Sequence, residues 1–121
     1  MLATRFRTMV ALSALFLFAT PSMAIDFTWD LGADGDWTNP ANWTPNGDPN
    51  NLLDNVFIDG GDTGNDVIVT LSLTRNIGSV TIDTGDELFV NNNVFLNVAG
   101  DIFNDGILSL RRRPSQECKD V

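Results

Sequence analysis

Short aliphatic runs with a period of two residues fill the chain from Val67 to Leu110. In such a run successive side chains point to opposite faces of a strand, so the pattern predicts short strands buried on one face. Helix formers do not gather at the three-to-four spacing that a helix needs, so we expect an all-β fold. The aliphatic positions of these strands are Val67, Val69, Leu71, Val80, Ile82, Leu88, Val90, Val94, Leu96, Val98, Leu108 and Leu110.

The runs are separated by segments rich in Asn, Asp and Gly, which tolerate turn geometry or hydrogen-bond their own backbone. Two architectures accept such a series. In an antiparallel sandwich or meander, Asn104-Asp105-Gly106 is a tight hairpin turn; in a parallel β-solenoid it is a corner between strands of different sheets. Very short strands, inward residues of similar size and corner asparagines that can stack favour the solenoid. The expected turns are residues 74–78, 83–87, 91–93 and 104–106.

Residues 25–66 have a different character, because all three tryptophans of the chain lie there among loop residues. A solenoid exposes its apolar interior at its ends, and an atypical terminal segment must cover it. We therefore expect an N-terminal cap over residues 25–66, solenoid coils over 67–110 and a basic, disordered tail over 111–121. The alternative is a row of exposed rings that stack on sugars, as in a carbohydrate-binding module. Both interpretations concern Trp29, Trp37 and Trp43.

The first 24 residues have the organisation of a secretory signal peptide. Arg5 and Arg7 precede an apolar run at residues 9–19, and small residues, Ser22 and Ala24, occupy the positions that signal peptidase reads. The run is too short for a membrane span, which needs about 20 residues. We expect cleavage after Ala24 and a secreted or cell-surface protein with no membrane span in its mature chain.

The chain is strongly acidic, with a net charge of −9 that becomes −11 when Arg5 and Arg7 are removed. Between residues 25 and 110 the only basic residue is Arg75. Such a body repels the phosphates of nucleic acids, so we exclude them as partners. Cys118 is the single cysteine and allows no internal disulfide.

The motif "GGDTGNDVI" at residues 60–68 resembles the calcium-binding nonapeptide of RTX β-rolls, in which glycines turn the chain and a corner carboxylate meets the ion. The resemblance makes Asp62 and Asp66 candidate calcium ligands. Thr63 is one residue too many for the pattern and the motif occurs once, so a plain Gly/Asp turn is the preferred interpretation. We expect no other cofactor.

Catalytic chemistry has little to build on in this sequence. The chain has no histidine and no tyrosine, and the lone Cys118 has no histidine to activate it. We therefore expect no catalytic residues and no enzyme activity. A polysaccharide-processing enzyme using a pair of carboxylates is the weakest alternative.

Several segments between residues 29 and 110 carry a resemblance to a known class of proteins: "DGDWTNPANW", "DNVFID", "VIVTL", "GSVTI" and "GDIFNDGILSL". Together they resemble the N-terminal portion of secreted bacterial β-solenoid proteins, of the autotransporter passenger and PEP-CTERM-associated repeat type. The resemblance implies a right-handed parallel β-helix outside the cell with a structural or adhesive role. It supplies no catalytic residues. The membrane barrel and the sorting signal that end such proteins have no counterpart in "RRRPSQECKDV".

The sequence thus favours a structural or adhesive module, with a calcium-dependent carbohydrate-binding module as the alternative. The polar tail cannot cover the last coil, so Ile107, Leu108 and Leu110 are expected to form an open apolar face. We expect its partners to be further coils of a longer parent chain or another copy of this chain, with surface glycans as a further candidate partner of the module.

Overall fold

The computed structural model describes residues 19, 21–58 and 65–111. These residues form short β-strands with one turn of 3₁₀ helix, Pro40–Asn42, so the expected all-β class is confirmed. Most of the expected signal peptide, the candidate ligand Asp62 and residues 112–121 of the tail lie outside the described residues. The strands are β1 (Asp26–Trp29), β2 (Gly35–Asp36), β3 (Trp43–Thr44), β4 (Asn55–Ile58), β5 (Ile68–Leu71), β6 (Arg75–Ile77), β7 (Ser79–Ile82), β8 (Glu87–Val90), β9 (Leu96–Val98), β10 (Ile102–Asn104) and β11 (Ile107–Leu110).

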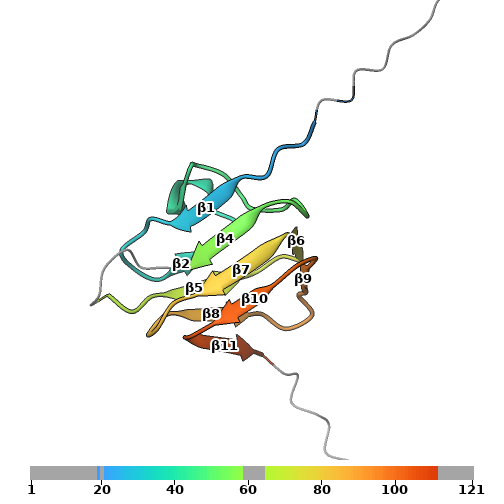
Figure 1. The fold of residues 1–121 in the computed structure, drawn as a ribbon. Coiled ribbons are helices and arrows are strands. Elements are labelled where there is room, and N and C mark those ends of the chain that lie inside the picture. Colours follow the sequence, from blue (N-terminus) through green and yellow to red (C-terminus); the bar gives the residue numbers. More distant parts are fainter. Residues whose placement is uncertain (1–18, 20, 59–64, 112–121) are drawn as a thin grey trace, which may run out of the picture.

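From β4 onward the chain visits three sheets in a repeating order. Strands β4, β7 and β10 belong to the first sheet, β5, β8 and β11 to the second, and β6 and β9 to the third. Each strand from β4 to β8 pairs in parallel with the strand three strands later (Figure 1). We call one passage through the sheets a layer: layer 1 is β1–β3, layer 2 is β4–β6, layer 3 is β7–β9 and layer 4 is β10–β11.

The parallel pairing begins inside the segment that the sequence assigns to the cap. Strand β1 pairs in parallel with β4, and β2 pairs in parallel with β5. Strand β3 then pairs antiparallel with the other edge of β1, so this sheet is mixed. Strand β3 is therefore the edge strand at the N-terminal end of the first sheet, and it covers the edge of β1 that faces away from β4.

The connections differ in length from layer to layer, although the strands stay in register. Between the first and second sheets lie residues 59–67 in layer 2, residues 83–86 in layer 3 and residues 105–106 in layer 4. Because β10 pairs with β7 and β11 pairs with β8, the Asn104-Asp105-Gly106 segment turns between two sheets. It is a corner and not the tight turn of an antiparallel hairpin.

Strand β6 corrects the sequence interpretation, which expected a turn at residues 74–78. Its residues pair in parallel with β9, and the backbone N–H of Arg75 donates to the carbonyl of Phe95 (3.0 Å). The Nδ2 atom of Asn97 also donates to Oδ1 of Asn76 (2.9 Å), which stacks two asparagines across the layers. The strand has a single aliphatic residue, the fully buried Ile77. A single aliphatic residue cannot form the alternating pattern by which a strand is recognised in a sequence.

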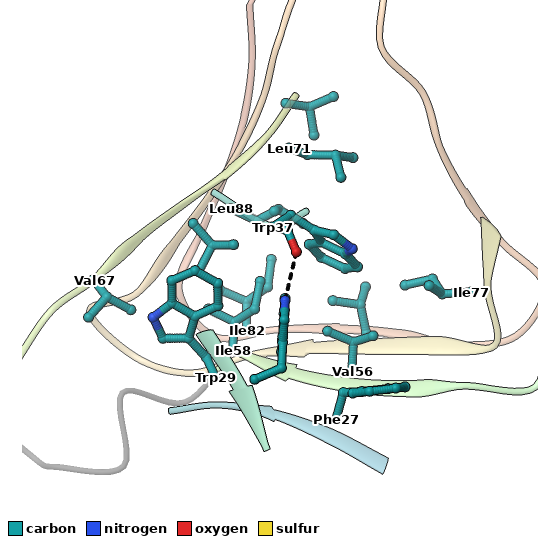
Figure 2. Packing of buried hydrophobic residues seen from close by; sticks show 14 residues of the cluster. Phe27, Trp29, Trp37, Val56, Ile58, Val67, Leu71, Ile77, Ile82 and Leu88 are labelled. Atoms are coloured by element: carbon teal, nitrogen blue, oxygen red, sulfur yellow. Dashed lines mark hydrogen bonds between the residues drawn. The ribbon is translucent and has the colours of Figure 1, made fainter. Parts of the chain in front are cut away.

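The core lies between the three sheets and contains the expected inward residues from Val67 to Val90 (Figure 2). It also contains Phe27, Val56, Ile58 and Ile77, which the period-two pattern did not single out. The expected inward residues Val94, Leu96 and Val98 are only partly buried, and Leu108 and Leu110 are exposed. Inward residues stack in register from layer to layer, as Val69, Leu88 and Leu108 do in the second sheet. Aliphatic side chains of similar size therefore form continuous columns. The buried hydrophobic residues are Phe27, Trp29, Trp37, Trp43, Val56, Ile58, Val67, Val69, Leu71, Ile77, Val80, Ile82, Leu88 and Val90.

The column of Leu88 and Leu108 offers a matched test of this packing. Leu88 is 0% exposed and Leu108 is 39% exposed, although they are register partners. We expect Leu88→Ala to lower the free energy of unfolding by about 2 to 5 kcal/mol because it leaves a cavity. Leu108→Ala should cost only about 1 kcal/mol, because less of the side chain is removed from water. Urea unfolding at low protein concentration measures both, and equal losses would contradict a core that ends at layer 4.

Candidate functional site

The three tryptophans form one contiguous cluster at the N-terminal end of the core. The ring of Trp43 meets those of Trp29 and Trp37 edge to face, with centroid distances of 5.0 Å in both pairs. All three side chains are buried. Trp29 lies in β1, Trp37 directly follows β2 and Trp43 lies in β3. The cluster therefore joins the strands of layer 1 to one another, and it belongs to the same core as the buried residues of layer 2.

Each indole N–H of the cluster has a backbone acceptor. Trp43 Nε1 donates to the carbonyl of Trp37 (2.7 Å), which is the bond drawn in Figure 2. Trp37 Nε1 donates to the carbonyl of Pro49 (3.1 Å), and Trp29 Nε1 donates to that of Ala33 (3.3 Å). Buried rings with satisfied N–H groups are core residues. In this arrangement they leave no ring face at the surface for a sugar to stack on.

The calcium motif is only partly described, since Asp62 lies outside the described residues. Asp66 is exposed, and its carboxylate lies against Gly85, where a Cβ would collide with it and where φ is +90°. Within the described residues no group of three or more His, Cys, Asp or Glu side chains is placed to hold a metal ion. Calcium binding by Asp62 and Asp66 therefore stays a prediction.

Two aspartates next to this corner bind backbone groups. Asp86 is buried, and its Oδ1 accepts from the N–H of Val67 (3.0 Å). Asp34 Oδ1 accepts from the N–H of Ile68 (2.7 Å). A carboxylate that accepts from a backbone N–H at the start of a strand satisfies a donor outside the ladder. These two carboxylates therefore fix the start of β5.

Arg75, the basic residue between residues 25 and 110, forms an ion pair with Asp48 that ties β6 to the loop before β4. Nε of Arg75 donates to Oδ1 of Asp48 (2.8 Å) and Nη2 donates to Oδ2, a two-bond arrangement that fixes the guanidinium. The hydrogen bonds that Arg75 donates to the carboxylate of Asp48 raise the pKa of Arg75 above its ordinary value. The sequence shows no sign of this pair, because the partners are 27 residues apart.

Asp36, the second residue of β2, is held in its ionised form. Burial raises its pKa, but hydrogen bonds from the hydroxyl and the N–H of Thr38, with help from Ser72 and the charge of Arg75, lower it by more. The net result is a pKa below the ordinary 3.8. This carboxylate belongs to the hydrogen-bond network of layer 1.

The most distinctive surface feature lies at the opposite end of the stack, where β9, β10 and β11 are the last strands of their sheets (Figure 1). Apolar side chains surround a hollow of about 580 Å³ there. We call these three strands and the hollow the C-terminal face. Its apolar lining includes Val90, Val94, Leu96, Ile102, Leu108 and Leu110, and the polar residues that line it are Asn91, Asn92, Asn93 and Arg111.

The expected open face is thus present in the described residues, with one difference in its membership. Leu108 and Leu110 stack on Leu88 and Val90 and line the hollow. Ile107 stacks on Glu87, so it lies on the outer surface beside the face. The period-two pattern of "ILSL" predicts this arrangement, since residues 108 and 110 point to one face of the strand and residue 107 points to the other.

Comparison with known proteins finds no matching family model, no matching curated protein and no matching solved structure. No helix among the described residues has the length and apolar character that crossing a bilayer requires.

Replacement of Trp43 tests whether the tryptophan cluster is structural. We expect Trp43→Ala to lower the free energy of unfolding by about 3 to 5 kcal/mol, because it removes a buried ring that contacts two others. Trp43→Phe should cost about 1 to 3 kcal/mol, since the carbonyl of Trp37 loses its donor. Phe103→Ala, an exposed aromatic on β10, is the control and should change stability by about 0.5 kcal/mol at most. Equal losses from the Trp43→Ala and Phe103→Ala variants in urea unfolding would show that the cluster does not support the core.

The lowered pKa of Asp36 predicts a pH-dependent contribution to stability. A carboxylate with a depressed folded pKa stabilises the protein fully above its unfolded pKa and loses that effect as pH falls through the folded value. Asp36→Asn should therefore destabilise the protein at neutral pH, and the difference from wild type should shrink below pH 3.8. Asp101→Asn, which removes one charge from an exposed position, is the control. A difference between wild type and Asp36→Asn that stays constant with pH would contradict this role.

Proposed function

We propose that this chain is a secreted or cell-surface structural module, built as the first coils of a right-handed parallel β-helix, that catalyses no reaction. The observation that carries the proposal is the repeating order of the three sheets, with every strand from β4 to β8 in parallel register with the strand three strands later. Asn55 pairs with Ser79, Ile68 with Glu87 and Arg75 with Leu96, which are separations of 24, 19 and 21 residues. Separations near 20 residues are typical of coils that stack along one axis.

The handedness of the proposed helix follows from a general rule. Crossover connections between parallel strands of one sheet are right-handed in the great majority of proteins, because the strands themselves have a right-handed twist. The chain from β4 to β7 makes such a crossover through β5 and β6. A right-handed coil is therefore the proposed arrangement, in agreement with the resemblance to secreted bacterial β-solenoid proteins.

A structural or adhesive role fits the chemistry of the described surface. The outward positions of the strands carry Thr, Ser and Asn, as at Thr70, Ser79 and Asn97, together with a few exposed apolar residues such as Phe103 and Ile107. The titratable groups with shifted pKa values serve the structure. An acidic surface with regularly spaced hydroxyl and amide groups suits contact with solvent and with hydrated glycans. The partners of such a module would be neighbouring coils and surface glycans.

Export of the full chain tests the cellular address. Produced in a bacterial host, the chain should appear outside the cytoplasm with Ile25 as its first residue, as mass spectrometry would show. Leu15→Arg places a charge in the apolar run at residues 9–19 and should keep the protein inside the cell with Met1 or Leu2 at its start. Cytoplasmic, unprocessed wild-type protein would contradict the proposal.

A melting experiment separates this function from the calcium-dependent carbohydrate-binding alternative. A bound ion stabilises the folded state by mass action, by about 2.7 kcal/mol at a hundredfold excess over its dissociation constant. We expect the same melting temperature in millimolar calcium and in chelator. A rise with calcium that Asp66→Asn abolishes would favour the alternative and its ligands Asp62 and Asp66.

A further inference from the structure

We propose that the C-terminal face binds the same face of a second copy of this chain, so that two molecules associate tail to tail about a two-fold axis. The inference goes beyond the proposed function, since it depends on the geometry of layer 4 and not on export or adhesion. Three observations carry it: the direction of the backbone groups of β11, the cover on the opposite end of the stack, and the uncharged edge strands.

The edge of β11 that faces away from β8 has backbone groups in position to pair with another strand. The N–H of Ile107 donates to the carbonyl of Asp86 (2.9 Å), and that of Arg111 donates to the carbonyl of Val90 (2.9 Å). Successive N–H groups of a strand point to opposite sides, so those of Leu108 and Leu110 point away from β8. Among the described strands none lies on that side of β11. A strand edge of this kind is a template for pairing with another chain.

The opposite end of the stack does not present an equivalent surface. There β3 already pairs antiparallel with the edge of β1, and the buried tryptophan cluster fills the end of the core. A second copy therefore finds no matching apolar end for head-to-tail stacking. A face that can bind only a like face gives an isologous contact, which closes at two copies.

The pairing of β3 with β1 also shows that an edge of this stack accepts an antiparallel strand. Two faces related by a two-fold axis perpendicular to the stack present their strands to each other in antiparallel directions. The hydrogen bonding at the dimer contact would then be of the kind that the chain already forms at its other end.

The chemistry of the face permits two copies to approach. Proteins protect exposed edges with lysine, proline or inward charges, whereas β9, β10 and β11 contain only uncharged residues and no proline. The strands of the face therefore bring no like charges together, and the charged residue that lines the hollow is Arg111, directly after β11. The net charge of −9 repels two copies at longer range. Because salt screens that repulsion, association should strengthen as ionic strength rises.

The size of the face sets the expected strength. Three short strands and the hollow between them are a small contact compared with standard protein interfaces, which bury about 1,200 to 2,000 Å² in total. We therefore expect a dimer that dissociates on dilution. Its formation is best followed over a wide range of protein concentration.

Sedimentation of the purified chain tests the proposal. Reductant must be present, because a disulfide between two Cys118 side chains would mimic association. We expect a species of twice the monomer mass that dissociates on dilution and gains from added salt. Leu110→Lys should give a monomer, since it places two like charges across the contact, and at 67% exposure the change leaves the monomer fold intact. Leu108→Lys, on the same side of β11, should act in the same way.

The matched control is Ile107→Lys, on the same strand but on the outer surface, where the side chain is 52% exposed. This variant should still form the dimer, and circular dichroism should show the same β-structure in all three variants. Three results would overturn the proposal: a wild-type monomer at every concentration, loss of the dimer in Ile107→Lys to the same extent as in Leu110→Lys, or growth of species larger than two copies. Dimerisation that appears only after deletion of residues 112–121 would also overturn it, since that tail would then be what covers the face.

Discussion

Each layer of this structure depends on its neighbours both for the hydrogen-bond partners of its strands and for the cover over its core. Val80 illustrates the dependence, because it lies in register between Val56 of the layer before and Ile102 of the layer after. Strands of three or four residues form no core alone, so stability is shared between adjacent layers. Most other features of the molecule align the layers, or cover the core at the two terminal layers, which each have only one neighbouring layer.

The ends of the stack show two different responses to that dependence. At the N-terminal end the chain supplies its own cover, since β3 returns antiparallel to β1 and the tryptophan cluster fills the remaining space. The loop that follows β3 is tied to the third sheet by the ion pair of Asp48 with Arg75. At the C-terminal end the described residues supply no such cover, and Leu110 stays exposed over a hollow.

The sequence predicts features that depend on local pattern and misses those that depend on distant partners. The inward positions Val69, Leu71 and Leu88 follow from period two, and the Trp-rich composition indicates that layer 1 differs from the rest. Strand β6 was expected to be a turn, because its pairing with β9 and the burial of Ile77 overrule a weak local preference. The Arg75–Asp48 pair and the antiparallel β3 join residues brought together by the stack, and no spacing in the sequence announces them. The open face was predictable from a polar tail after an apolar strand, apart from the outward position of Ile107.

The corners between the first and second sheets differ in length, over residues 30–34, 59–67, 83–86 and 105–106, while the strands they join keep their register. The number of residues in this corner therefore does not affect the register of the strands that it joins. Insertions and deletions there can accumulate during evolution without moving an inward side chain into solvent. The same independence makes this edge of the molecule a natural position for grafting foreign peptide loops, provided that Val67 and Asp86 are kept, since these two corner residues are buried and joined by a hydrogen bond.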